Sequence, residues 1–112
     1  VFRRHQYFGD FRTKSKNVKV IYRDPQTVDG DFLRVYHNDK IVRDQINLQG
    51  SFTGFTYELV EGFNKFDFEA LNEGQYFPNT GEFSIVIDGE VIYNSEWYLA
   101  TGFKATFLIV KE

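Results

Sequence analysis

Residues 65–70 read KFDFEA, an unbroken alternation of charged and apolar side chains. Successive side chains of a strand point to opposite faces, so this period of two predicts a β-strand with one buried face. Similar alternation recurs at residues 18–23, 33–35, 55–59, 83–87 and 103–109, and residues 41–48 and 91–93 follow turn signals as further predicted strands.

Turn signals separate these runs at intervals of about 10 residues, a spacing typical of β-sandwiches and small barrels. Asp88-Gly89 is the strongest two-residue hairpin signal, and Asn38-Asp39 indicates a second hairpin. Only residues 97–100 have helical character, and there is no alternation of strands with helices. We therefore predict an all-β fold, a single antiparallel β-sandwich of seven to eight short strands with immunoglobulin-like or C2-like topology.

Length and composition agree with this fold. A chain of 112 residues is expected to form one domain with its own core. It has no cysteine, which excludes disulfides and thiolate metal sites. Its thirteen phenylalanines and seven tyrosines suit the half-buried surface of a sheet, so we expect them mainly in the core.

Charge divides the chain into two parts. Residues 1–17 hold five basic residues and one acidic residue, a net charge of +4, whereas residues 18–112 hold eight basic and fifteen acidic, a net charge of −7. We predict a basic N-terminal arm or edge extension over 1–17, with Arg3 and Arg4 as candidate contacts to a partner, and a β-sandwich domain over 18–112. The acidic body disfavours nucleic acid, because it would repel phosphates.

The chain begins at Val1 and contains no methionine. Removal of a signal peptide would produce such a start, and so would truncation of a longer chain. We expect an exported protein, periplasmic or secreted. No apolar run approaches the roughly 20 residues of a membrane helix, so no membrane-spanning segment is expected.

Catalytic patterns are absent from the sequence. His5 and His37 are the only histidines, and there is no cysteine and no Gly-x-Ser-x-Gly motif. We predict a protein that is not an enzyme. A hydrolase with paired carboxylates stays an alternative, because such pairing is spatial and sixteen acidic residues are present.

Asp24, Asp29 and Asp31 cluster in one predicted loop. Sandwich proteins of the C2 type bind calcium with carboxylates on inter-strand loops, because hard cations prefer several oxygen ligands. We take these residues as a candidate calcium site, to which Asn72 with Glu73, or Asp88, would contribute if their loops lie at the same end. The alternative is turn chemistry with solvated charge. No other cofactor is indicated.

The longest polar loop, residues 72–81, combines two aromatic side chains with amides and a carboxylate. Such a surface suits stacking on a sugar or anchoring into a protein partner, and the alternative is that the aromatics close the end of the sandwich. Trp97 and Tyr98 raise the same question. The candidate partner-binding residues of this loop are Asn72, Glu73, Gln75, Tyr76, Phe77 and Asn79.

Several stretches together resemble a family of small secreted β-sandwich proteins of Bacteroidota. They are VIYRD (20–24), VDGD (28–31), GFNK (62–65), ALNEG (70–74), PNT (78–80) and WYLATGFKAT (97–106). The resemblance spans nearly all of the chain after the arm. It implies a soluble sandwich and, most concretely, the plug subunit of the type 9 secretion translocon, which closes the periplasmic side of a large outer-membrane barrel. It carries over no individual site residue.

We therefore expect a noncatalytic, exported module that binds a protein partner, with the translocon barrel as the concrete case. The alternative is a calcium-assisted carbohydrate-binding module, in which Tyr76→Ala or Trp97→Ala would abolish glycan retention.

Overall fold

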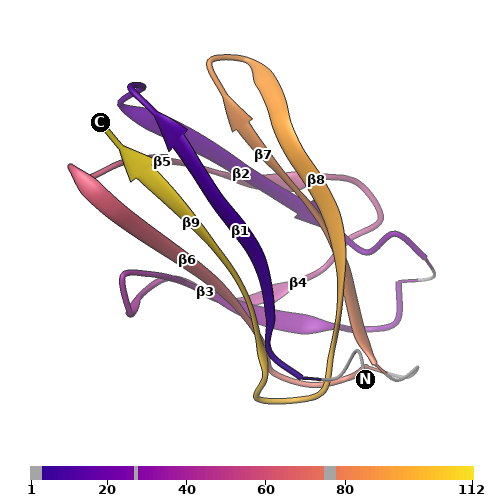
Figure 1. Cartoon of the computed structure of the whole chain (residues 1–112). Helices are drawn as coiled ribbons and strands as arrows, with labels where there is room; N and C mark the ends of the chain where they lie inside the picture. Colours follow the sequence, from indigo (N-terminus) through magenta and orange to yellow (C-terminus); the bar gives the residue numbers. More distant parts are fainter. Residues whose placement is uncertain (1–3, 27, 75–77) are drawn as a thin grey trace.

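The computed structural model describes residues 4–26, 28–74 and 78–112, and these form two β-sheets packed face to face as a sandwich (Figure 1). One sheet has five strands in the order β1-β9-β6-β3-β4, and the other has four in the order β5-β2-β7-β8. The strands are β1 (Gln6–Thr13), β2 (Asn17–Arg23), β3 (Phe32–His37), β4 (Lys40–Asn47), β5 (Thr53–Glu58), β6 (Gly62–Ala70), β7 (Asn79–Ile87), β8 (Glu90–Leu99) and β9 (Lys104–Lys111).

The prediction of an all-β sandwich is confirmed, and two of its details are wrong. The described residues form nine strands instead of seven or eight, and β1 pairs in parallel with β9, so the five-stranded sheet is mixed. The helical character of residues 97–100 does not produce a helical turn, because β8 continues to Leu99. Within the described residues, no helix has the length and hydropathy needed to cross a membrane.

Both predicted hairpins are confirmed. Asn38 and Asp39, between β3 and β4, have φ angles of 48° and 70°. Asp88 and Gly89, between β7 and β8, have φ angles of 52° and 80°. Positive φ at both central residues is the conformation that matches the twist of the flanking strands, and Asn, Asp and Gly adopt it at the lowest cost.

The strand β1 lies in the segment expected as a basic arm or edge extension, and it occupies the edge of the five-stranded sheet. Its pairing with β9 shifts between Tyr7 and Asp10, around Gly9 with φ of 114°. This bulge turns both Phe8 and Phe11 inward, where Phe8 packs on Phe83 with ring centroids 5.1 Å apart. The bulge breaks the period of two, which explains why alternation is weak in this part of the sequence.

Aromatic rings fill the space between the sheets. Phe66, Phe68, Phe83, Trp97 and Phe107 are all fully buried. The rings of Phe83 and Phe107, from opposite sheets, lie 5.7 Å apart at 7°, and those of Phe68 and Trp97 lie 4.9 Å apart at 22°. The expectation that the aromatic residues mainly form the core is therefore confirmed for these side chains.

Candidate metal centre

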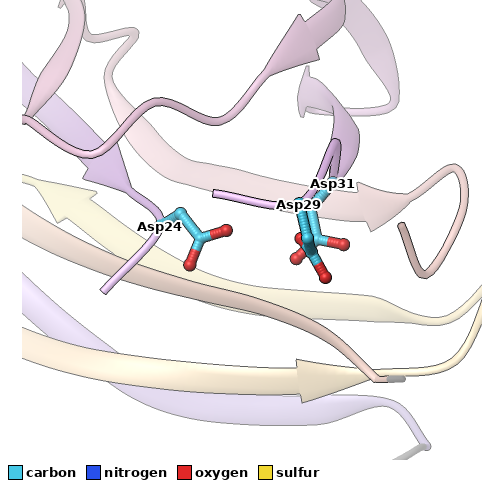
Figure 2. A group of neighbouring side chains, drawn as sticks. All are labelled: Asp24, Asp29 and Asp31. Carbon is cyan, nitrogen blue, oxygen red and sulfur yellow. The ribbon is translucent and has the colours of Figure 1, made fainter. Parts of the chain in front are cut away.

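Asp24, Asp29 and Asp31 lie together at one end of the sandwich, where the chain leaves β2 and enters β3 (Figure 2). One carboxylate oxygen from each residue lies within 4.8 Å of the others. The sequence-based expectation that these three residues share one loop and converge is thus confirmed by the geometry.

Backbone hydrogen bonds hold both ends of this loop against the segment that follows β4. The Asp24 N–H donates to the carbonyl of Gln49 at 2.7 Å, and the Leu48 N–H donates to the carbonyl of Asp31 at 2.9 Å. Between Asp29 and Asp31, Gly30 has φ of 86°, a conformation that favours glycine. These contacts fix Asp24 and Asp31, at the two ends of the loop, so that the carboxylates lie together.

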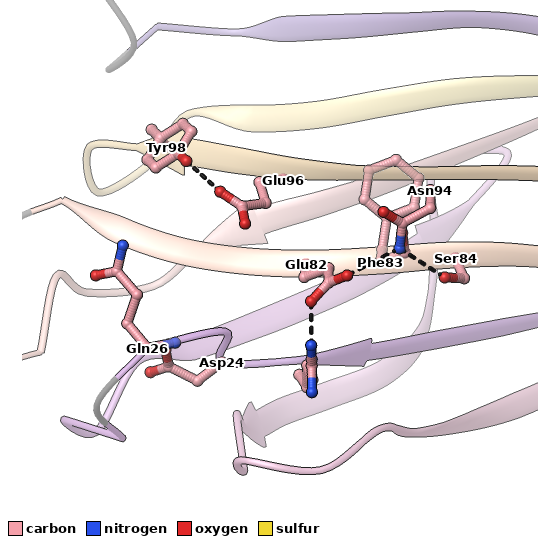
Figure 3. Close-up of polar contacts among 9 residues, drawn as sticks. Asp24, Gln26, Glu82, Phe83, Ser84, Asn94, Glu96 and Tyr98 are labelled. Atoms are coloured by element: carbon pink, nitrogen blue, oxygen red, sulfur yellow. Dashed lines mark hydrogen bonds and ion pairs between the residues drawn. The ribbon is translucent and has the colours of Figure 1, made fainter.

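Two of the carboxylates are buried without full hydrogen bonding. Asp24 and Asp31 are 3% and 1% exposed. One oxygen of each is satisfied: Asp24 Oδ1 accepts from the Gln26 N–H at 3.0 Å (Figure 3), and Asp31 Oδ2 accepts from the Thr80 N–H at 3.1 Å. Within the described residues, no donor reaches Asp24 Oδ2 or Asp31 Oδ1 in good hydrogen-bond geometry, although Asp29 lies beside both carboxylates through its N–H and its side chain. No described ion pair involves Asp24 or Asp31. Buried carboxylate oxygens are rarely left in this state, because desolvation is costly.

Gly74 is distant from the three aspartates in the sequence, but it packs directly against them in the structure. A Cβ at this position would lie 2.6 Å from Asp31 Oδ1, 2.8 Å from the carbonyl oxygen of Asp29 and 2.9 Å from Asp29 Oδ1. Only a residue without a side chain permits this approach. The Asp29 carbonyl oxygen therefore lies beside the same point as the carboxylate oxygens of Asp29 and Asp31.

The electrostatics of the cluster favour a proton or a cation over free negative charge. Burial raises the pKa of Asp31 to about 7, and the bond from the Thr80 N–H opposes this rise. The charges of Asp29 and Asp24 and a hydrogen bond between the Asp31 and Asp29 carboxyl groups add to the rise. Burial also raises the pKa of Asp24, with the charge of Asp29 adding to it. A divalent cation would reverse this balance by compensating the carboxylate charges.

The raised pKa of Asp31 predicts how stability depends on pH when divalent cations are removed by a chelator. In the folded chain this pKa is about 7, above its unfolded value of roughly 3.9, so the folded state holds an extra proton between these values. The free energy of unfolding should therefore fall as pH rises from about 4 to about 7, and then level off. Urea denaturation at a series of pH values measures this. A slope over the same range that is unchanged in Asp31→Asn would contradict the assignment.

The structure places Asn72 and Asn79 where they hold the loop ends together. Asn72 Oδ1 accepts from the Phe32 N–H at 2.8 Å, and Asn72 Nδ2 donates to the Gly30 carbonyl at 2.9 Å. Asn79 is fully buried; its Nδ2 donates to the carbonyls of Phe32 and Asn72, and its Oδ1 accepts from Trp97 Nε1 at 3.0 Å. These amides bind Asn72 and Asn79 to the segment that carries the aspartates.

Of the other candidate partner-binding residues, the structure describes only Glu73 and Arg4. Glu73 Oε2 accepts from the Thr101 N–H at 2.9 Å, and Arg4 is exposed. Gln75, Tyr76, Phe77 and Arg3 lie outside the described residues.

The structure also shows where Trp97, Tyr98 and Asp88 lie. Trp97 is 1% exposed and belongs to the core, while Tyr98 is half-buried and its hydroxyl donates to Glu96 (Figure 3). Asp88 lies at the opposite end of β7 from Asn79, where it accepts from the Ser15 hydroxyl at 2.6 Å, so it is not available to the aspartate cluster. The condition on which Asp88 would contribute, a loop at the same end as the aspartates, is therefore not met.

The roles of Gly74 and Asn72 at this centre were not visible as a sequence pattern. Asn72 and Gly74 are separated from the aspartate loop by roughly forty residues, and glycine offers no side chain to suggest a contact. The only signal was the expectation that the 72–81 loop and the aspartate loop share one end of the sandwich.

Comparisons of the chain with protein-family models, with curated proteins and with solved structures return no match. The resemblance to the secreted sandwich proteins of Bacteroidota therefore stays a prediction.

Proposed function

We propose that this chain is a noncatalytic, exported binding domain whose loop end is organised by one calcium ion held by Asp24, Asp29 and Asp31. One observation carries the proposal: two almost fully buried carboxylates each point an unpartnered oxygen into a cluster with a third carboxylate. A bound cation would compensate all three charges at once. Calcium held on inter-strand loops at one end of the sandwich is also what the predicted C2-like topology implies.

The ligand set favours calcium over other metals. All of the candidate donors are oxygens, from the three carboxylates and the carbonyl of Asp29. Zinc and copper sites use imidazole and thiolate, and neither side chain is present in this cluster. Magnesium demands a small octahedral shell and usually keeps several waters, whereas calcium accepts six to eight oxygens in flexible geometry.

Burial also argues for an ion with a structural role. At 3% and 1% exposure, Asp24 and Asp31 present almost no surface to a substrate. A glycosidase needs two carboxylic groups that flank a substrate in an open cleft. The cluster therefore supports cation binding better than the alternative of a carboxylate hydrolase.

Calcium is expected to raise the melting temperature of the wild-type protein. An ion at about 100 times its dissociation constant contributes roughly 2.7 kcal/mol, which corresponds to an increase on the order of 10 °C for a domain of this size. Gly74→Ala should abolish this increase, because the added Cβ would lie within 2.9 Å of three cluster oxygens. Thermal melts in millimolar calcium and in chelator measure both effects.

Gly62→Ala is the matched control. Gly62 has φ of 83°, similar to the 67° of Gly74, so alanine carries a comparable backbone cost there, but its Cβ would meet nothing within 4 Å. This variant should be destabilised and still respond to calcium. Equal responses of the two alanine variants, or no response of the wild type, would remove the calcium proposal.

A second candidate function is the one expected first from the sequence, binding to a protein partner. It is favoured by two exposed aromatic side chains on the outer face of the five-stranded sheet, Tyr7 and Phe63, which are 63% and 68% exposed. Exposed aromatics are common anchors of protein interfaces. The concrete form remains a plug on the periplasmic side of an outer-membrane type 9 secretion barrel, a role that rests on the resemblance.

A pull-down from native envelopes with the chain tagged at Glu112 tests this second candidate. Stoichiometric recovery of a large outer-membrane barrel would support it, and recovery of nothing above background would remove it. Replacing Phe63 by serine should reduce recovery without affecting the response to calcium, because Phe63 lies in β6, outside the aspartate loop.

A further inference from the structure

A small pocket lies at the same end of the sandwich as the candidate metal centre. It has a volume of about 270 Å³ and is lined by Phe32, Gln45, Leu71 and Asn72. Phe32 begins β3 directly after Asp31, and the Leu71 N–H donates to the Phe32 carbonyl at 3.0 Å. The pocket is therefore built onto the segment that carries the aspartates.

Gln45 is held at this pocket in a strained backbone conformation. Its φ is 51°, in the left-handed region that residues with a side chain adopt rarely. The strand pairing explains the position: Leu33 pairs with Ile46 but Val35 pairs with Arg43, so two residues of β4 oppose one residue of β3 in a bulge. Bulges of this kind redirect a side chain, and strained residues cluster at ligand sites.

An ion pair keeps the bulge in place. Arg34, the residue of β3 opposite the bulge, donates from Nε to Asp44 Oδ1 at 2.6 Å and lies 3.7 Å from Glu69. Within the described residues, the side-chain amide of the next residue, Gln45, has no hydrogen-bond partner. The sheet thus fixes Asp44, and the exposed Gln45 amide beside it lies at the pocket, where water or a ligand can reach it.

The lining defines the chemistry of a ligand. Phe32 and Leu71 offer apolar surface, whereas Gln45 and Asn72 offer neutral amides; none of these four residues is charged. Such a surface disfavours ions, which need charged partners when desolvated. It suits a sugar ring, which has an apolar C–H face and a rim of hydroxyls, and the volume is slightly below that of sites for drug-sized ligands, about 300 Å³ or more.

We propose that this pocket binds one residue of an uncharged saccharide, with the ring against Phe32 and hydroxyls hydrogen-bonded to Gln45 and Asn72. The coupling to the metal rests on the proposed function. Asn72 is hydrogen-bonded to Gly30, between two of the aspartates, and to Phe32 in the pocket. An ion that orders the aspartate loop also orders these two pocket residues, so calcium strengthens saccharide binding.

Nuclear magnetic resonance titration of the ¹⁵N-labelled chain tests this inference. The probes are the methyl glycosides of glucose, galactose, mannose and N-acetylglucosamine, each added in millimolar calcium and in chelator. At least one glycoside should shift the backbone amides of the four lining residues, with an affinity several-fold higher in calcium. Shifts confined to the lining residues would indicate binding in the pocket. Shifts spread over the whole chain would indicate nonspecific binding.

Gln45→Gly tests the role of the Gln45 side-chain amide in binding without a loss of stability. Glycine suits φ of 51°, so this variant should be at least as stable as the wild type while its affinity for the glycoside falls about tenfold, the effect of roughly 1.4 kcal/mol. Asp39→Gly is the matched control, because it relieves a φ of 70° in the β3–β4 turn, away from the pocket lining. It should bind the glycoside as the wild type does.

The outcomes separate this inference from the proposed function. Calcium-dependent shifts around Asp29 and Asp31 without a response to any of the four glycosides would overturn the saccharide pocket alone. Unchanged affinity in Gln45→Gly would also overturn it. Glycoside shifts at the lining residues with no effect of calcium anywhere in the spectrum would support the pocket and overturn the calcium site.

Discussion

Replacement of Asp31 by asparagine is expected to stabilise the cation-free protein and to abolish its response to calcium. Asp31 is 1% exposed and has one oxygen without a partner among the described residues, so its negative charge is costly when no cation is bound. The neutral amide keeps the size of the side chain and an oxygen for the Thr80 N–H. In chelator near neutral pH, we expect the free energy of unfolding to rise by about 1–3 kcal/mol.

The same substitution removes a ligand, so in calcium the order of stability should reverse and the wild type should be the more stable. Urea denaturation of the wild type and of Asp31→Asn, each in calcium and in chelator, measures the four free energies of unfolding. Asp67→Asn is the control, because Asp67 is also buried, at 3% exposure, but it lies in β6 outside the cluster and its Oδ2 is 3.8 Å from Lys65 Nζ. It should retain the calcium response. A destabilised Asp31→Asn protein in both conditions would indicate a purely structural carboxylate.

Gly81→Ala is expected to cause a large loss of stability in the core. Gly81 pairs with Trp97 across β7 and β8, and a Cβ at Gly81 would lie 2.0 Å from Cζ2 and 2.3 Å from Cε2 of the indole. The ring cannot move away easily, because it stacks on Phe68 and donates to Asn79. Overpacking of this severity should cost about 3 kcal/mol or more, a large part of the 5–15 kcal/mol typical of a small domain.

Urea denaturation of Gly81→Ala and of Gly50→Ala checks this expectation. Gly50 is a suitable control because its added Cβ would meet only Val28 Cγ2, at an ordinary distance of 3.6 Å, and its stability should change by roughly 0.5 kcal/mol or less. Trp97→Phe in the Gly81→Ala protein should recover part of the loss, since the smaller ring vacates the space. Equal stability of the two alanine variants would show that the indole is not held where the structure places it.

The position of Trp97 also changes how one sequence-based expectation is tested. Loss of glycan retention in Trp97→Ala would be ambiguous, because truncation of a fully buried Trp costs about 3–5 kcal/mol and would unfold part of the population. Gln45→Gly is the better probe of saccharide binding, because it acts on an exposed side chain.

Strands with strict alternation and hairpins with marked turn residues could be predicted from the sequence. Residues 65–70 lie within β6, and Asp88-Gly89 connects β7 to β8 as expected. Both signals are local, so no knowledge of the partner strand is needed. The parallel pairing of β1 with β9 could not be predicted, because its bulge at Gly9 hides the period of two and because its partner is about a hundred residues away.

The candidate site likewise contains residues that could be predicted from the sequence and residues that could not. Asp24, Asp29 and Asp31 could be proposed because they fall within eight residues of one loop. The contact of Gly74 and the strained position of Gln45 could not, because the first depends on packing between distant segments and the second on a shift in strand register. Neither leaves a pattern in residue type or spacing.

Calorimetric titration of calcium into the metal-free protein is the most direct test of the central claim, that the aspartate cluster is a calcium site. The structure predicts saturable binding of one calcium ion per chain, with no binding to Asp31→Asn and retained binding to Asp67→Asn. Heats no larger than those of dilution, or equal binding to the wild type and Asp31→Asn, would contradict it.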